Sequence, residues 1–367
     1  MTDPRMRNLA NILVDYSVKV QPGEWVILRG HHIAEPLLNE IAKKVVEAGA
    51  FVDTMFESSV ITETMLKYAS REQLMWESPI IRTAIEKVDV FINIIATDNT
   101  KHLSNTDPAQ QQAGNLSMAK LMPLYMERES RGDLRWTLTQ YPCQAFAQDA
   151  EMSLSEYEDF VYAATFADID DPVSKWLDVR EKQEKLVNWL KGKESITVNG
   201  PDIDLTLSVK DRLFANCCGE KNMPDGEIFT SPVENSANGW VKFTYPAIEK
   251  GKEVEGVRLE FKDGKVVKAT AEKNEDFLIK MLDTDDGSRY LGEFAIGTNY
   301  GIKKFTKSIL YDEKIGGTIH MAVGNGMPEL GSKNQSTIHW DMICDMHNDS
   351  QILVDGELFY KNGQFQV

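Results

Sequence analysis

The 367-residue sequence has only four cysteines and no apolar run of the length that crosses a membrane. The cysteines, at positions 143, 217, 218 and 344, form no CxxC pair, which argues against a disulfide framework and against a thiolate zinc site. A membrane span needs about 20 consecutive apolar residues, and residues 1–7 lack the basic start and the apolar stretch of a secretory signal. We therefore expect a cytoplasmic protein with reduced thiols and no membrane partner.

Basic residues are also scarce, because 40 Lys and Arg stand against 57 Asp and Glu and leave a formal net charge of -17. This charge repels phosphate backbones, and no cluster of basic and aromatic residues in the sequence offsets it, so we do not expect nucleic acid as a partner. The hydrophobic share of 42% is typical of a globular enzyme. An acidic surplus can serve either solubility or cation binding, and the positions of individual carboxylates must decide between the two.

The first half of the chain alternates apolar and amphipathic segments. Residues 24–56 hold two short apolar runs with a helically spaced segment between them, which indicates a β-α-β order. The run 88–96 is apolar almost throughout, as expected for a strand that a parallel sheet buries on both faces. We predict that residues 1–185 form an α/β domain with a largely parallel open sheet.

The second half of the chain has a different pattern. Beyond a segment rich in helix formers at 147–193, short β-type runs are separated by turn dipeptides such as Asp263-Gly264. We therefore expect residues 186–367 to form a β-rich α+β domain with at least one helix near 276–282. Two hydrophobic cores are also expected because 367 residues exceed the usual size of a domain with a single core.

Several common catalytic motifs are missing from the sequence. The turn after the first predicted strand reads Arg29-Gly30-His31-His32 and has neither a GxGxxG nor a Walker pattern, so we expect no nucleotide cofactor. His31 and His32 are interpreted as loop or helix-start residues without a functional role. The absence of HExxH and GxSxG argues against a thermolysin-like zinc site and against a serine nucleophile.

Three of the six histidines lie beyond residue 319, and two of them fall in strand-like sequence. In the segment 338–341, the two-residue period of a strand places His339 and Asp341 on one face, where an imidazole and a carboxylate could bind zinc, cobalt or manganese. A solvated pair at a sheet edge is the more common interpretation of an isolated His-x-Asp pattern. His320 lies on a face of small residues, and a hydrogen-bonded core histidine is the alternative there.

Two acids also stand out by their context. Glu227 follows the turn Pro224-Asp225-Gly226, at a point where a loop enters a strand. Glu293 lies within the largely apolar segment 290–297 and is expected to be buried. A buried carboxylate is costly unless it is hydrogen-bonded, protonated or paired with a cation, so a structural acid and a metal ligand are both open interpretations.

Together these segments resemble the aminopeptidase T family of thermophilic-type metallo-aminopeptidases. The resemblance lies in Pro-Asp-Gly-Glu-Ile-Phe-Thr-Ser-Pro at 224–232, Leu-Gly-Glu at 291–293, Ile-Gly-Thr-Asn at 296–299, the histidine at 320, and Ile-His-Trp-Asp-Met-Ile at 338–343. It implies two divalent metal ions per chain, zinc, cobalt or manganese, whose ligands are Glu227, Glu293, His320, His339 and Asp341. It also implies that Glu293 bridges the two ions and that Glu313 is an additional candidate ligand.

The activity implied by the resemblance is that of a metal-dependent aminopeptidase. Such an enzyme hydrolyses N-terminal residues from peptides with a metal-activated water, and here Glu293 would be the catalytic proton acceptor in the β-rich domain of a homodimer. A metallohydrolase of non-peptide amides would share every ligand and is one alternative. Relatives also tend to have a tyrosine shortly after the equivalent of His320, whereas this sequence reads Asn-Gly-Met-Pro at 325–328. That departure leaves open a metal-binding homologue with altered catalysis.

Overall fold

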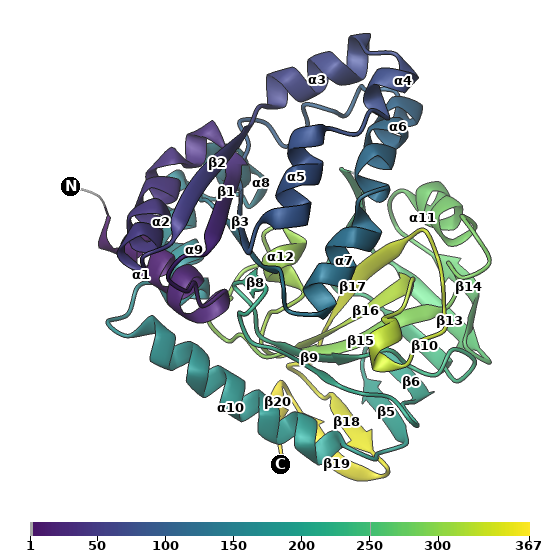
Figure 1. Ribbon diagram of the computed structural model, residues 1–367. Helices are drawn as coiled ribbons and strands as arrows, with labels where there is room; N and C mark the ends of the chain where they lie inside the picture. Colours follow the sequence, from purple (N-terminus) through teal and green to yellow (C-terminus); the bar gives the residue numbers. More distant parts are fainter. Residues whose placement is uncertain (1–2, 250) are drawn as a thin grey trace. The chain divides into compact units, whose positions relative to one another are not determined.

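The computed structural model describes residues 3–249 and 251–367 (Figure 1). The chain forms two compact units. The N-terminal unit comprises Met1–Val173 and Gly219–Met223, and the C-terminal unit comprises Ser174–Cys218 and Pro224–Val367. The domain boundary predicted at residue 185 falls inside helix α10 (Pro172–Leu190), most of which belongs to the C-terminal unit.

A five-stranded parallel sheet forms the centre of the N-terminal unit. Its strands are β1 (Trp25–His31), β2 (Phe51–Glu57), β3 (Val90–Ile95), β4 (Arg135–Gln140) and β8 (Asn222–Met223). Their order is β2-β1-β3-β4-β8, and each neighbouring pair is parallel. This confirms the predicted α/β unit with an open parallel sheet. The chain places β2 on one side of β1 and β3 on the other, so the direction of winding reverses between β1 and β3.

Helices cover both faces of this sheet (Figure 1). The helical elements of this unit are α1 (Pro4–Asn11), the π-helix η1 (Ile12–Ser17), the 3-10 helix η2 (His32–Ala34), α2 (Glu35–Glu47), α3 (Ser59–Tyr68), α4 (Arg71–Leu74), α5 (Pro79–Lys87), α6 (Pro108–Ala119), α7 (Met122–Ser130), α8 (Gln144–Asp149) and α9 (Leu154–Ala164). Gly30 of β1 lies against Leu38 of α2, whereas Ile27 of β1 packs in a cluster with Ile85 of α5. Alternate residues of β1 therefore face α2 and α5. None of the described helices is long and apolar enough to cross a membrane.

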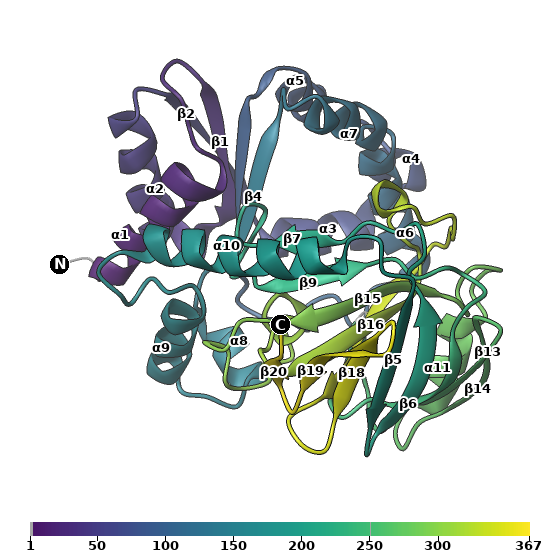
Figure 2. The same cartoon turned by 90° about the horizontal axis from the view of Figure 1, so that it is seen from below.

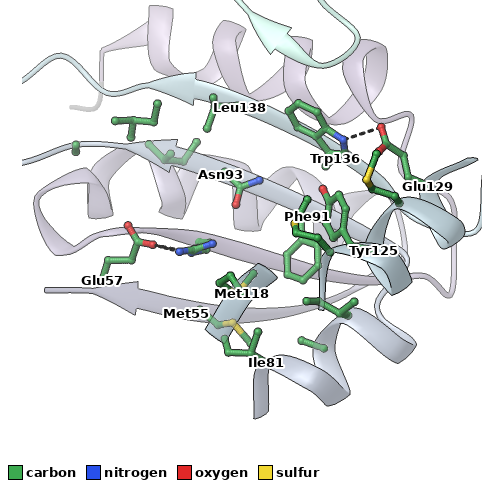
Figure 3. A pocket seen from close by; sticks show the side chains of 18 residues that line it. Met55, Glu57, Ile81, Phe91, Asn93, Met118, Tyr125, Glu129, Trp136 and Leu138 are labelled. Atoms are coloured by element: carbon green, nitrogen blue, oxygen red, sulfur yellow. Dashed lines mark hydrogen bonds and ion pairs between the residues drawn. The ribbon is translucent and has the colours of Figure 1, made fainter. Parts of the chain in front are cut away.

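The α5 side of the sheet contains a cavity of about 580 Å³ (Figure 3). Residues of β1 to β4 line one side of it, and residues of α5, α6 and α7 line the other. Much of its lining is apolar and includes Phe91, Tyr125 and Trp136. Arg29 and Glu57 also line it, and the Arg29 Nε donates a hydrogen bond of 2.6 Å to Glu57.

Antiparallel sheets make up most of the C-terminal unit. An eight-stranded sheet has the order β14-β13-β10-β6-β5-β18-β19-β20, a five-stranded sheet has the order β17-β16-β15-β9-β7, and β11 pairs with β12. The strands are β5 (Ser195–Gly200), β6 (Ile203–Ser208), β7 (Ala215–Cys217), β9 (Glu227–Thr230), β10 (Asn238–Lys242), β11 (Ala247–Glu249), β12 (Lys252–Val254), β13 (Arg258–Lys262), β14 (Lys265–Thr270), β15 (Leu291–Gly297), β16 (Thr318–Gly324), β17 (His339–Asp345), β18 (Gln351–Val354), β19 (Glu357–Lys361) and β20 (Gln364–Phe365).

The helical elements of this unit are few and short apart from α10. They are α11 (Glu275–Leu282), α12 (Ile309–Asp312) and the 3-10 helix η3 (Pro328–Leu330). The predicted helix near 276–282 is α11, and the β-rich α+β class predicted for this half of the chain is confirmed. Val198 and Leu205 of the larger sheet share one buried apolar cluster with Phe294 and Met321 of the five-stranded sheet. The two sheets therefore pack face to face around a common core.

Candidate metal centre

The five-stranded sheet of the C-terminal unit turns one face to the apolar core and presents polar residues on the other. Phe294 lies in the core, so the alternation along β15 puts its neighbour Glu293 on the opposite face. On that face, Glu293 and Asp341 are both register partners of Ala322, one on each side of β16. The small alanine side chain leaves space between the two carboxylates.

The five residues implied by the family resemblance converge on this face. His320 Nε2 lies 3.1 Å from Glu227 Oε2 and 3.3 Å from Glu293 Oε1. His339 Nε2 lies 3.3 Å from Glu293 Oε2 and 3.5 Å from Asp341 Oδ2. The two oxygens of Glu293 therefore face two different histidines. Two sets of three potential ligand atoms result, and in each set the atoms lie within 4.8 Å of one another.

The hydrogen bond made by the other side of the His339 ring defines what its Nε2 can do. Nδ1 lies 2.8 Å from the carbonyl oxygen of Asn325, which can only accept, so Nδ1 carries a proton and donates it. In the neutral imidazole Nε2 then has a lone pair, and that lone pair is directed at Glu293 and Asp341. Acceptors that face one another need a proton or a cation between them. Metal-binding histidines commonly donate their other ring N–H to a backbone carbonyl, as His339 does to Asn325.

Most of this cluster is shielded from water. Glu227, Glu293 and His320 are 6%, 5% and 1% exposed. The buried Oδ1 of Asp341 has no hydrogen-bond partner among the described residues. Buried carboxylates without full hydrogen bonding are destabilising unless positive charge lies beside them, so this donor set fits a divalent cation.

The electrostatics of the cluster are dominated by opposite charges in a dry environment. Burial favours neutral forms, but the contacts between Glu293 and the two histidines outweigh it and lower the pKa of Glu293 to about 2. Burial also opposes the charge on His339, whose pKa is nevertheless raised to about 10 by Glu293 and Asp341. The carboxylates that raise the pKa of His339 would also attract a metal ion. That ion could replace the proton on the histidine.

A lysine that was not predicted from the sequence lies beside the centre. Lys314 is fully buried, and its ammonium group forms a close ion pair with Glu313 and lies 3.4 Å from Glu227 Oε1 and 4.0 Å from Asp225 Oδ1. Burial raises the pKa of Glu313 to about 8, although Lys314 opposes this shift. The additional candidate Glu313 is thus near the centre, with a ligand atom within 4.8 Å of ligand atoms of His320 and Asp341.

A glutamine of α10 supports the strand that carries Glu227. The side-chain amide of Gln183 donates hydrogen bonds to the carbonyl oxygens of Cys217 and Glu227, at 2.8 and 3.0 Å, and accepts one of 2.6 Å from Thr298 Oγ1. Figure 2 shows α10 running alongside β7 and β9, as these bonds require. Gln183 therefore positions Glu227. This role could not be predicted, because the sequence does not distinguish a polar helix residue that supports a site from one that is exposed to solvent.

The segment that departs from the family pattern contacts the sheet through its backbone. The N–H of Met327 donates a hydrogen bond of 2.9 Å to Ser231 Oγ, and η3 begins at the next residue. Tyr300 and Tyr311 of the same unit carry hydroxyl groups that could replace the one expected here. Tyr300 donates its hydroxyl to the carbonyl oxygen of Gly363 at 2.7 Å, and Tyr311 is fully buried.

The third histidine of the C-terminal stretch lies outside the centre. His347 forms a close contact with Asp345 through Nδ1 and belongs to none of the groups of potential metal ligands among the described residues. None of the four cysteines forms a disulfide bond. Cys217 lies near Asp225 and Glu227, where burial and these carboxylates raise its thiol pKa well above the usual value. A protonated thiol is a poor nucleophile and a poor metal ligand.

Comparison with known proteins relates the whole chain to metallopeptidases. The model of a family described as thermophilic metalloprotease (M29) matches residues 2–365. Aminopeptidase 2 of Geobacillus stearothermophilus is 27% identical over 371 residues, which cover 94% of this chain and 89% of that protein. Aminopeptidase AmpS of Bacillus subtilis is 25% identical, with 98% of each chain covered.

A solved structure also resembles this fold. Wild-type AmpT from Thermus thermophilus superposes with a TM-score of 0.86 over 99% of both chains, at 21% sequence identity. At that identity the likeness concerns the fold. It agrees with the combination of an open parallel sheet and antiparallel sheets described above.

Proposed function

Because the chain belongs to the thermophilic metalloprotease (M29) family, it is a metallo-aminopeptidase, and we propose that its centre binds two divalent cations. The family resemblance expected from the sequence is confirmed by the same match. The observation that carries the proposal is the position of Glu293, whose two carboxylate oxygens face His320 and His339 separately.

The proposed ligands form two sets that share one residue. Glu227, Glu293 and His320 would bind one cation, and Glu293, His339 and Asp341 would bind the other. Glu313 is an additional candidate. Imidazole nitrogens with carboxylate oxygens suit zinc, cobalt or manganese.

Hydrolysis then needs a nucleophile and a proton carrier. Two such cations would lower the pKa of a water and polarise the scissile carbonyl group. We assign Glu293 to accept the proton of the attacking water and to return it to the leaving amine. Contacts with the two histidines lower the pKa of Glu293 to about 2, so its carboxylate is ionised at neutral pH.

The substrates in this proposal are peptides with a free N-terminus. The free α-amine of a peptide could bind one cation through its lone pair or, when protonated, pair with an acid near the centre. A blocked terminus offers no such group. Cleavage would therefore be restricted to the first residue of unblocked peptides.

We also propose a homodimer. Large apolar side chains are exposed along α3 and the segment after it, including Tyr68 at 82%, Val60 at 70% and Trp76 at 65%. Exposed apolar surface of this kind commonly marks a protein interface. Sedimentation of the chain over a range of concentrations would measure the assembly, and a monomer at all concentrations would contradict it.

A chelation experiment tests the proposed function. The protein would be stripped with a chelator, reloaded with zinc, cobalt or manganese, and assayed on matched pairs of N-terminally free and blocked peptides. We expect metal-dependent release of the first residue from the free peptides alone. Activity that survives complete removal of metal would contradict the proposal, and hydrolysis confined to non-peptide amides would favour the alternative metallohydrolase.

A further inference from the structure

A second group of potential metal ligands lies in the N-terminal unit. It consists of His31 at the end of β1, His32 at the start of η2, and Asp98 shortly after β3, and we call it the His31 group. One ligand atom from each residue lies within 4.8 Å of the other two. The chain brings them together across a sequence separation of more than sixty residues, because β1 and β3 are neighbouring parallel strands.

The position of the His31 group in the sheet is the one at which open α/β sheets bind ligands. β1 lies between β2 and β3, so the connections leave its carboxyl end in opposite directions. In open α/β sheets the loops diverge at such a point and leave a crevice outside the strand ends. His31 is the last residue of β1, and its register partner on β2 is Glu57.

The spacing of the ligand atoms fits a shared ion. His31 Nε2 lies 3.5 Å from Asp98 Oδ2. Two ligands that each bind an ion at about 2.1 Å with tetrahedral geometry are about 3.4 Å apart. The nitrogen-to-oxygen distances in the candidate metal centre, 3.1 to 3.5 Å, fall in the same range.

His31 is buried, but its hydrogen bonds are longer than those that normally stabilise a buried polar side chain. The side chain is 3% exposed, yet its Nδ1 lies 3.4 Å from the amide of Ile33 and its Nε2 lies 3.3 Å from Ser59 Oγ. Strong bonds of these types measure about 2.7–3.2 Å. An ion at Nε2 would move the ring proton to Nδ1, and the long contacts of Nε2 with Ser59 and of Nδ1 with Ile33 would both be given up.

Burial and the neighbouring His32 ring both favour the neutral form of His31. Burial lowers the pKa of His31, and His32, whose ring centroid is 4.2 Å away, lowers it further. The carboxylates of Asp98 and Glu57 oppose this shift. A neutral imidazole next to carboxylates is the usual partner of a divalent transition metal.

We propose that His31, His32 and Asp98 bind one zinc-like divalent ion, separate from the C-terminal centre. Three protein ligands leave a fourth position for water or for an exogenous ligand. Glu57, next to His31 in the sheet, lines the apolar cavity of this unit (Figure 3). The ion would therefore lie at the end of the sheet face that forms the cavity.

Zinc content of the full-length protein tests this site. The parent and three variants, His32→Ala, Asp98→Asn and His347→Ala, would be equilibrated with micromolar free zinc and analysed by elemental mass spectrometry. His32 and Asp98 are exposed, so both variants should fold, and His347→Ala is a matched control at an exposed histidine of the other unit. Circular dichroism and peptide hydrolysis verify that the variants are native.

We expect His32→Ala and Asp98→Asn each to contain one zinc ion fewer per chain than the parent. His347→Ala should keep the parent value. Equal zinc content in all four proteins would overturn the proposal. A similar loss in His347→Ala would also overturn it, because it would indicate unspecific binding to exposed histidines.

Discussion

The candidate metal centre and the His31 group are built on different kinds of backbone. In the centre, Glu293, His320 and Asp341 extend from neighbouring antiparallel strands, whose register sets their spacing. In the His31 group, the side chains lie at or beyond the carboxyl ends of parallel strands, and Asp98 belongs to a connecting segment. Strand-held ligands separate only if the sheet is disrupted, whereas a loop can adjust to its ion.

The two groups also differ in burial. His320 is 1% exposed, and the side chain of Asp98 is 56% exposed. Charges in a dry site interact more strongly than charges in water, and an unpaired one is more destabilising. Substitutions around the centre should therefore change stability as well as chemistry, whereas substitutions of the exposed His32 and Asp98 should mainly change metal content.

The largest effect is expected for Glu293→Gln. The amide cannot accept the proton of the attacking water, and general-base catalysis alone contributes about 10²- to 10⁴-fold to a rate. We expect kcat to fall by at least that factor with an unchanged circular dichroism spectrum, whereas Asp98→Asn should leave kcat unaltered. If Glu293→Gln retained its activity, the role assigned to this carboxylate would be wrong.

A large effect on stability is expected for Lys314→Met. The substitution removes a fully buried ammonium group that pairs with Glu313 and lies 3.4 Å from Glu227, so both carboxylates lose positive charge beside them. Breaking a buried ion pair typically destabilises a protein by about 3–5 kcal/mol. Urea unfolding in chelator should show this loss, and added zinc should recover part of it because divalent cations also neutralise the carboxylates.

The exposed Lys333→Met is the matched control for that substitution and should lie within about 0.5 kcal/mol of the parent. Equal stability of the two variants in chelator would show that Lys314 does not compensate the acids of the centre.

A smaller and pH-dependent effect is expected for Asp285→Asn, which loosens the segment leading to His339. Asp285 accepts hydrogen bonds of 2.7 to 2.8 Å from the Thr337 backbone and from Ser336 and Ser288 hydroxyls. Although partial burial opposes it, these bonds lower the pKa of Asp285. The stability they provide is therefore present above the unfolded pKa of about 4 and is lost as the pH falls below it.

Urea unfolding between pH 7 and pH 3 measures this dependence. The variant should be about 1–3 kcal/mol less stable than the parent at pH 7, and the difference should shrink at low pH. Asp286→Asn, at an exposed neighbouring acid, should show no such trend. A constant difference at all pH values would contradict the assigned hydrogen bonds.

Part of the centre follows from local pattern. The two-residue period of a strand predicted that His339 and Asp341 share a face. In the structure, His339 Nε2 lies 3.3 Å from Glu293 and 3.5 Å from Asp341. The same period isolated His320 on a face of small residues, where Ala322 now leaves room between two carboxylates. The roles of these residues as metal ligands stay predictions.

Other parts of the molecule had no local signal. Lys314 follows Glu313 in an ordinary polar stretch, and lysine is almost never fully buried without a partner, so only the fold could reveal it. His31 and His32 were interpreted as helix-start residues, and they do flank the start of η2. Asp98 makes them a candidate site, and its approach depends on the parallel pairing of β1 with β3.

The sequence by itself determined the α/β and β-rich classes, the family and the identities of five clustered side chains. Strand and helix periods and short motifs are local, so they can be read along the chain. Only the tertiary structure decided which oxygen faces which histidine, which lysine is buried, and which loop meets the end of β1. These features depend on contacts between residues far apart in sequence, and such contacts exist only once register and strand order are set.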